Sequence, residues 1–211
     1  MAVRVLLLLA VIGYTHCQLI KLSCQQVRQF VDGHNWRREQ LLQGKVPGQP
    51  SASEMTYMVW DQELAAKAEM WASQYRYQHN NDRTIPSGRY ETGENLYWYI
   101  TSDFNYQLNP DSACESWFNE YKDYTYGKMK PSDFGGPKDI GHYTQMAWSD
   151  SKYLGCAMSQ WSIDGYNKYF VVCNYGPPGN YMGQYPYPSG GPGSRLTCRT
   201  GDCSRPYGNN C

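Results

Sequence analysis

The sequence YLGCAMSQWSIDGYNKYFVVCNY, residues 153–175, consists of two largely apolar runs on either side of Asp164-Gly165. Asp-Gly is a strong signal for a two-residue type I′ hairpin turn, because both central residues of that turn need positive φ. We therefore expect two antiparallel strands, over residues 153–161 and 167–175. Asp-Gly is among the strongest short hairpin signals, so the other elements are placed around this hairpin.

The same hairpin fixes the relative position of two cysteines. If the turn pairs Ile163 with Tyr166, counting outward places Cys156 opposite Cys173. The alternation of pairs makes this a non-hydrogen-bonded pair, in which α-carbons approach to about 4.5–5.5 Å. That separation suits a disulfide. The spacing thus predicts a Cys156–Cys173 disulfide.

Three helices are expected outside the hairpin. Apolar residues at helical spacing predict one helix over residues 25–43 and a second from an N-cap at Asp61 to about Tyr77. The segment Ser112–Glu115 fits the capping-box pattern, which predicts a third helix running to about Tyr124.

The N-terminal residues have the composition of a signal peptide. Met1–Arg4 is basic, Val5–Ile12 is apolar, and small residues precede a cleavage site between Cys17 and Gln18. The apolar run is too short to cross a bilayer, which needs about 20 residues. A buried N-terminal helix or strand is the alternative interpretation. We expect residues 1–17 to be removed and the protein to be secreted to the extracellular space, without a transmembrane anchor.

Composition and charge limit the classes of partner. The formal net charge is +0, so nothing favours nucleic acid or anionic membrane as a general partner. The length suits one domain, and the hydrophobic fraction of 41% is that of a globular protein.

The cysteine count is odd once the signal segment is removed. Of 8 cysteines, Cys17 leaves with that segment, and the rest should mostly pair in an oxidising compartment. One thiol is therefore free, or links to another molecule, or the expected cleavage site is wrong. Spacing leaves open the pairing of Cys24, Cys114, Cys198, Cys203 and Cys211.

The composition changes after residue 176. Residues 176–207 are rich in Gly, Pro and Tyr, with neither strand nor helix periodicity. We expect an extended tail that buries little and is held by Cys198, Cys203 and Cys211. The domain is accordingly placed at residues 25–176 and the tail at 177–211.

Few residues are candidates for chemistry. His34, His79 and His142 have no partner at local metal-binding spacing, so residue types alone favour a structural role for each. Glu94 precedes an aromatic run, and Glu120 lies on an otherwise apolar helix face; local hydrogen bonding would explain both. The chain has no nucleophile elbow, P-loop or dinucleotide-binding motif.

Four motifs, in this order, resemble the CAP superfamily of cysteine-rich secretory, antigen-five and plant pathogenesis-related proteins. They are Gly93–Leu96, Trp117–Glu120, Gly141–Trp148 and Tyr169–Tyr181. Together they lie within residues 25–181, so the resemblance covers most of the chain. It implies an α+β fold, a three-layer α-β-α sandwich with a central antiparallel sheet between helices.

The resemblance also implies that four of the candidate residues line one open cleft: His79, Glu94, Glu120 and His142. In many relatives the two histidines hold Zn²⁺, and the glutamates bind its waters. His79 and His142 are therefore the expected metal ligands. His79 is assigned only by its position along the chain, because no motif surrounds it.

The tail resembles the hinge of cysteine-rich secretory proteins through Tyr185–Tyr187. Relatives often carry a cysteine where this chain has Gly193, which would leave one tail thiol without its usual partner. The six-cysteine module of channel-blocking relatives is missing before Cys211, so channel blocking is not expected.

Two functions follow from these features. The first is an extracellular binding module for a lipid, a sterol or a protein receptor, with a role in defence, venom or signalling. The alternative is a zinc-assisted hydrolase or peptidase, with Glu120 or Glu94 as general base. The missing nucleophile and the family resemblance favour binding. The sequence indicates neither the ligand nor the oligomeric state.

Overall fold

The computed structural model describes residues 18–136, 138–209 and 211, and the expected signal segment 1–17 lies outside them. Within the described part, no helix is long and apolar enough to span a membrane. In chain order the elements are β1 (Gln18–Ile20), α1 (Cys24–Leu42), β2 (Val59–Trp60), α2 (Gln62–Ala72), β3 (Gly93–Thr101), α3 (Pro110–Asn119), the 3₁₀ turns η1 (Glu120–Lys122) and η2 (Pro131–Asp133), α4 (Gly141–Met146), β4 (Tyr153–Ile163) and β5 (Tyr166–Gly176).

The β4–β5 hairpin forms the centre of the sheet. Asp164 and Gly165 both have positive φ, as a type I′ turn requires, and Ile163 pairs with Tyr166. Cys156 lies opposite Cys173, and the two form a disulfide with α-carbons 4.1 Å apart. The turn thus determines the register of the two longest strands.

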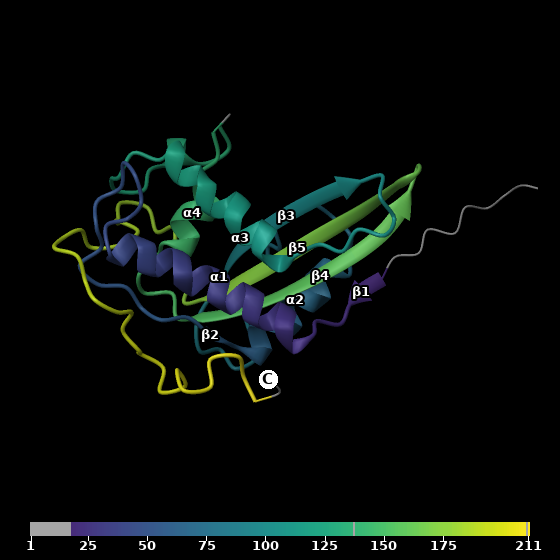
Figure 1. Ribbon diagram of the computed structural model, residues 1–211, viewed down its shortest axis with the longest axis horizontal. Coiled ribbons are helices and arrows are strands. Elements are labelled where there is room, and N and C mark those ends of the chain that lie inside the picture. Colours follow the sequence, from purple (N-terminus) through teal and green to yellow (C-terminus); the bar gives the residue numbers. More distant parts are fainter. Residues whose placement is uncertain (1–17, 137, 210) are drawn as a thin grey trace, which may run out of the picture.

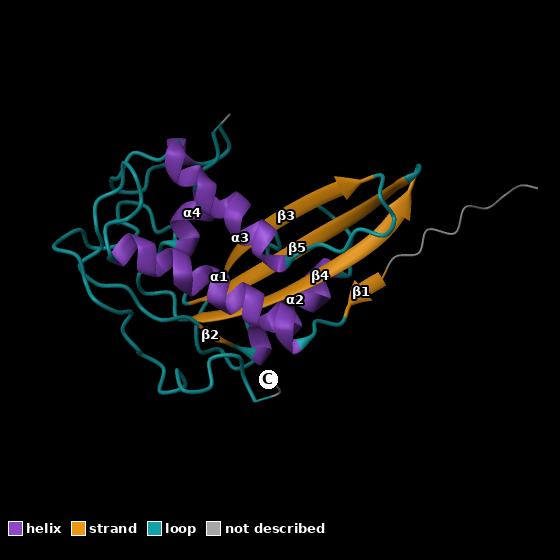
Figure 2. Ribbon diagram, in the orientation of Figure 1, coloured by secondary structure: helices purple, strands orange, loops and turns teal. Residues whose placement is uncertain are grey.

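The sheet lies between two helical layers. Its strand order is β1-β4-β5-β3, with antiparallel pairs, and the two-residue β2 adds a short parallel pair to β4. In Figure 1 and Figure 2, α1, α3 and α4 lie on one side of the strands and α2 on the other. The expected α-β-α sandwich is confirmed.

Alternation along β5 explains why both faces of the sheet are covered. Tyr169, Val171 and Cys173 point into the core beneath α1, α3 and α4, whereas Phe170 and Val172 point to a second core beneath α2. Successive strand residues point to opposite faces, so a strand covered on both sides is apolar throughout.

The first two helices begin close to where the sequence places them. Ser23 caps α1 through a capping box with Gln26, and Asp61 caps α2 by accepting bonds from two backbone N–H groups. The predicted end of α2 near Tyr77 is wrong, because the helix ends at Ala72 and Tyr75 has a φ of 54°. His79 therefore lies in the following loop.

The predicted boundaries of the third helix are also wrong. α3 begins at Pro110, not Ser112, because Asn109 accepts a bond from the Asp111 N–H and proline suits the first helical position. It ends at Asn119, and Glu120 begins a 3₁₀ turn.

A buried arginine joins α1 to the segment that follows α4. The Arg38 side chain is fully buried, and its guanidinium donates hydrogen bonds to five backbone carbonyls. These belong to Thr56, Met146, Trp148, Ser149 and Ser151. Buried polar groups need such partners, so Arg38 fixes the path of the chain next to α4.

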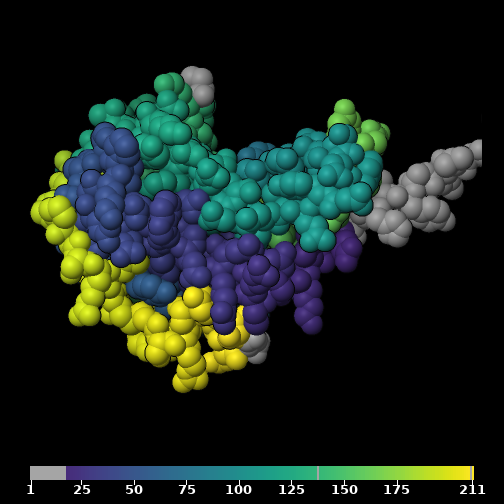
Figure 3. Space-filling model, in the orientation of Figure 1, coloured from purple at the N-terminus to yellow at the C-terminus, as the bar shows by residue number. Residues whose placement is uncertain are grey.

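The tail runs along the surface of the domain, and its cysteines correct one expectation. Figure 3 shows it in yellow along the lower edge of the molecule, beside α1. Part of the tail nevertheless packs into the core, because the Tyr187 side chain is buried. Cys198 pairs with Cys203, and Cys211 pairs with Cys24 at the start of α1.

An unpaired thiol in the tail is therefore a wrong expectation. In the described part of the chain, the cysteine without a disulfide is Cys114, on the buried face of α3. Its side chain lies in the core beside His34, out of contact with the tail cysteines. Burial raises the pKa of the Cys114 thiol and keeps it protonated.

Candidate functional site

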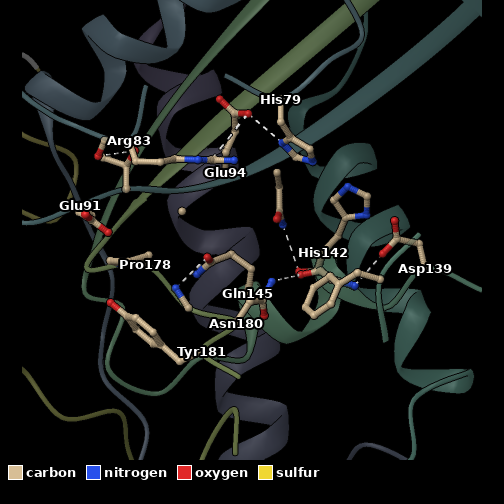
Figure 4. Close-up of a pocket in the computed structure, with 16 residues that line it drawn as sticks. His79, Arg83, Glu91, Glu94, Asp139, His142, Gln145, Pro178, Asn180 and Tyr181 are labelled. Carbon is tan, nitrogen blue, oxygen red and sulfur yellow. Dashed lines mark hydrogen bonds and ion pairs between the residues drawn. The ribbon is translucent and has the colours of Figure 1, made fainter. Parts of the chain in front are cut away.

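A pocket of about 400 Å³ opens where β3, α4 and the start of the tail meet. Figure 4 shows its lining. The beginning of β3 contributes Gly93–Asn95, α4 contributes His142 and Gln145, and residues 178–181 of the tail complete the wall. Most of these residues belong to the motifs identified in the sequence, and the fold brings the motifs together.

His79 and Glu94 form the first hydrogen-bonded pair of the site. His79 Nδ1 lies 2.8 Å from Glu94 Oε1, which also accepts a bond from the Asn80 backbone N–H. The Glu94 side chain is completely buried, whereas half of the His79 side chain is exposed. Glu94 thus fixes from behind an imidazole that reaches solvent.

His142 and Glu120 form the second pair. His142 Nδ1 lies 2.6 Å from Glu120 Oε1, and Glu120 Oε2 accepts bonds from the backbone N–H groups of His142 and Tyr143. The His142 ring also stacks on Trp117, with centroids 6.2 Å apart. Glu120 lies behind His142 and does not line the pocket itself.

The two pairs share one arrangement. Each carboxylate can only accept, so the proton of a neutral imidazole lies on Nδ1 and the lone pair lies on Nε2. Among the described residues, neither Nε2 has a hydrogen-bond partner. Both histidines line the same pocket and lie toward the same end of it in Figure 4.

Among the described residues, the arrangement offers a metal two imidazole nitrogens. No group of three His, Cys, Asp or Glu side chains in the described residues is close enough to hold a metal ion together. Carboxylate-oriented histidines are nevertheless the usual form of metal-binding imidazoles. The donor set fits a metal that keeps other positions open for water or ligand.

Several residues of the pocket were not predicted as site residues. Gln145 accepts a bond from the Gly179 N–H, and Asn180 links the tail to the start of α4 by donating to the Gly141 carbonyl and accepting from Thr144. Gln145 and Asn180 both lie within motifs that resemble the CAP superfamily, and this position in a motif could have identified them as site residues. They hold the tail against α4 and so shape the wall of the pocket.

Arg83, Glu91 and Asp139 give the pocket its remaining charges. The Arg83 guanidinium lies 4.0 Å from Glu94, and Figure 4 shows its side chain extending toward that carboxylate. No sequence pattern marks these three residues, because they come from irregular segments.

The remaining candidate, His34, lies away from the pocket. Its side chain is fully buried, with Nδ1 2.7 Å from the Phe30 carbonyl and Nε2 2.9 Å from the Tyr175 hydroxyl. Burial lowers the pKa of His34 to about 3, an effect that the Phe30 carbonyl partly opposes. A neutral imidazole satisfies both contacts, so His34 is structural.

The geometry can now be compared with known proteins. A family model described as the cysteine-rich secretory protein family matches residues 31–175. The chain belongs to the CAP family. Venom allergen 5 of Rhynchium brunneum is 36% identical over 168 residues, covering 77% of this chain and 72% of the relative. Venom allergen 5.02 of Vespa crabro is 37% identical over 164 residues, covering 75% and 78%.

Solved CAP structures agree with the fold. The crystal structure of Na-ASP-1 is 32% identical with a TM-score of 0.65, and it covers 85% of this chain. This chain spans about half of that protein, 47%. A structure titled "Crystal structure of NaASP2 with Zn2+" is 29% identical with a TM-score of 0.65, covering 80% of this chain and 88% of the other.

Proposed function

We propose that this CAP protein is a secreted extracellular binding protein whose cleft holds a divalent metal such as Zn²⁺ through His79 and His142. One observation carries the proposal. Both imidazoles are fixed at Nδ1 by a glutamate, which leaves both Nε2 atoms without a protein partner among the described residues. The relative whose title names Zn²⁺ supports the same choice of metal.

When bound, the metal would supply a Lewis acid with open coordination positions. The protein's own contribution is orientation. Glu94 and Glu120 keep the rings turned so that Nε2 is available, and they make each imidazole a better donor. With two protein ligands, the affinity should be modest and should depend strongly on both glutamates.

The positions of the carboxylates favour binding over hydrolysis. A general base must be within reach of the proton that it removes. The Glu94 side chain is completely buried, and both Glu120 oxygens already accept hydrogen bonds. Hydrolysis or peptidase activity in the same cleft is therefore the less well supported alternative.

The cleft suits a lipid poorly, because nine of its sixteen lining residues carry a charged, imidazole or amide side chain. A groove between α1 and α3 is more apolar, with Val46, Pro47, Phe118 and Tyr121 in its lining. Its aliphatic and aromatic side chains offer apolar contact to an acyl chain or sterol, beside the charged Arg37, Lys45 and Glu115. A protein receptor is the other partner in this proposal.

Zinc titration by calorimetry of the purified secreted protein tests the metal site. We expect stoichiometric binding that is lost in His79→Ala and in His142→Ala. Glu120→Gln should weaken binding roughly 10–100-fold, because it removes the group that orients His142. Asp164→Asn is a matched control, since it removes an exposed charge at the hairpin tip and keeps a turn-compatible sequence.

A second readout locates the metal. Because Trp117 stacks on His142, zinc at His142 should change tryptophan fluorescence in the native protein. Zinc binding that survives both histidine substitutions would contradict the proposed site. Peptide or ester turnover that disappears with chelator and with His142→Ala would favour the hydrolase instead.

A further inference from the structure

Gln18 has a distinctive position in the fold. It is the first residue of β1, whose backbone pairs with β4 in the register Gln18 opposite Gln160 and Ile20 opposite Met158. If cleavage occurs before Gln18, as the sequence predicts, this residue carries both the α-amine of the chain and a side-chain carboxamide. Its side chain is exposed, so the two groups are free to meet.

The described surroundings of Gln18 offer no ionic partner to an α-amine. A pocket of about 270 Å³ beside it is lined by glutamine amides and by apolar or aromatic side chains. None of the described residues that line this pocket carries a carboxylate. They are Gln18, Ile20, Gln26, Gln107, Leu108, Met158, Gln160 and Tyr169. An α-amine is mostly protonated at neutral pH, and no carboxylate in this lining pairs with it to hold it away from the side-chain carboxamide.

We propose that the mature N-terminus is pyroglutamate, formed from Gln18. The α-amine nitrogen attacks the side-chain carbonyl carbon Cδ, and a new N–Cδ bond closes a five-membered lactam. The Cδ–Nε2 bond breaks, and the departing nitrogen takes up the proton that the amine loses and leaves as ammonia. Nothing is oxidised or reduced, and no further reactant is consumed.

The product is compatible with the position of Gln18 in the sheet. The lactam keeps one N–H and the backbone carbonyl of Gln18, so both groups stay available for the pairing of β1 with β4. The chain also loses the free amine that aminopeptidases require, which protects a three-residue strand at the edge of the sheet.

Mass spectrometry of the N-terminal peptide from the secreted protein tests the proposal, which rests on the expected cleavage before Gln18. The expected peptide begins at Gln18 and is lighter than the unmodified peptide by one ammonia. A peptide with an intact glutamine and a free amine would overturn the proposal. A mature chain that begins at another residue would overturn it as well.

Aminopeptidase digestion gives a second measurement. Gln18→Ser keeps a polar residue at this exposed site but has no carboxamide, so it cannot cyclise. We expect the native protein to keep its N-terminal mass while Gln18→Ser loses residues of β1 in sequence. Equal trimming of the two proteins would contradict a blocked N-terminus, and equal resistance would show that the strand itself gives the protection.

Discussion

Acid should destabilise this protein through a histidine that lies outside the cleft. His34 is fully buried, and its two nitrogens are satisfied by the Phe30 carbonyl and the Tyr175 hydroxyl. Burial is the main reason that the pKa of His34 is lowered to about 3, and the nearby Arg37 and Arg38 lower it further. The folded protein therefore holds a neutral imidazole at pH values where the unfolded chain holds a charged one.

The sign and size of the effect follow from this difference. Between about pH 6.5 and pH 3 the unfolded state binds one more proton at His34, so stability falls as the pH falls. The contribution is fully present above about pH 6.5 and decreases by about 1.4 kcal/mol for each pH unit below it. Near pH 4 the loss should reach about 3 kcal/mol relative to neutral pH.

Urea unfolding at a series of pH values, with the disulfides intact, measures this loss. His34→Gln cannot titrate, so its free energy of unfolding should fall less steeply with acid than that of the native protein. The difference between the two slopes isolates His34 from the carboxylates that titrate in the same range. Identical slopes, or an imidazole resonance of His34 that titrates near pH 6.5 in the native protein, would refute the reasoning.

Three further changes test how the fold is held together. Arg38→Met removes five hydrogen bonds to backbone carbonyls, and of these, among the described residues, only Trp148 and Ser149 keep a backbone donor, so the free energy of unfolding in urea should fall by about 3–5 kcal/mol. A loss below about 1 kcal/mol would contradict that role. Gly155→Ala forces a methyl group against the α2 backbone at Leu64 and Ala65, so we expect a lower melting temperature and a loss of about 1–3 kcal/mol in the free energy of unfolding. An unchanged melting temperature would mean that the helix can move away. Asp61→Ala removes the cap of α2 and should cost about 1 kcal/mol in chemical denaturation, and a neutral result would show that the Asp61 cap contributes little.

Structure that depends on neighbouring residues could be predicted from the sequence. The Asp164-Gly165 turn fixes the hairpin register, and alternation then places Cys156 opposite Cys173. Asp61 likewise marks the start of α2, because a side-chain cap acts within one helical turn. The start of the third helix is also decided by neighbouring residues. The prediction of Ser112 is wrong because Asn109 as cap and Pro110 as first helical residue form a stronger helix start.

The pairing of Cys24 with Cys211 could not be predicted from sequence spacing. Cys24 and Cys211 are separated by 187 residues, and nothing in their local sequence distinguishes Cys211 from Cys114 as the partner of Cys24. The packing of α3 decides the matter by burying Cys114 in the core, while the tail carries Cys211 to the start of α1. A disulfide needs a short α-carbon separation, which only the folded chain provides.

By itself, the sequence determined the hairpin, the Cys156–Cys173 pair and the start of the second helix, because turn dihedrals, strand alternation and helix caps act over a few residues. The meeting of His79 with Glu94 and of His142 with Glu120 was not derivable from local rules. The partners are 15 and 22 residues apart and lie on different elements. The packing of β3, α3 and α4 around the hairpin brings them together, and it leaves both Nε2 atoms at one pocket because the two carboxylates occupy the other ring nitrogens.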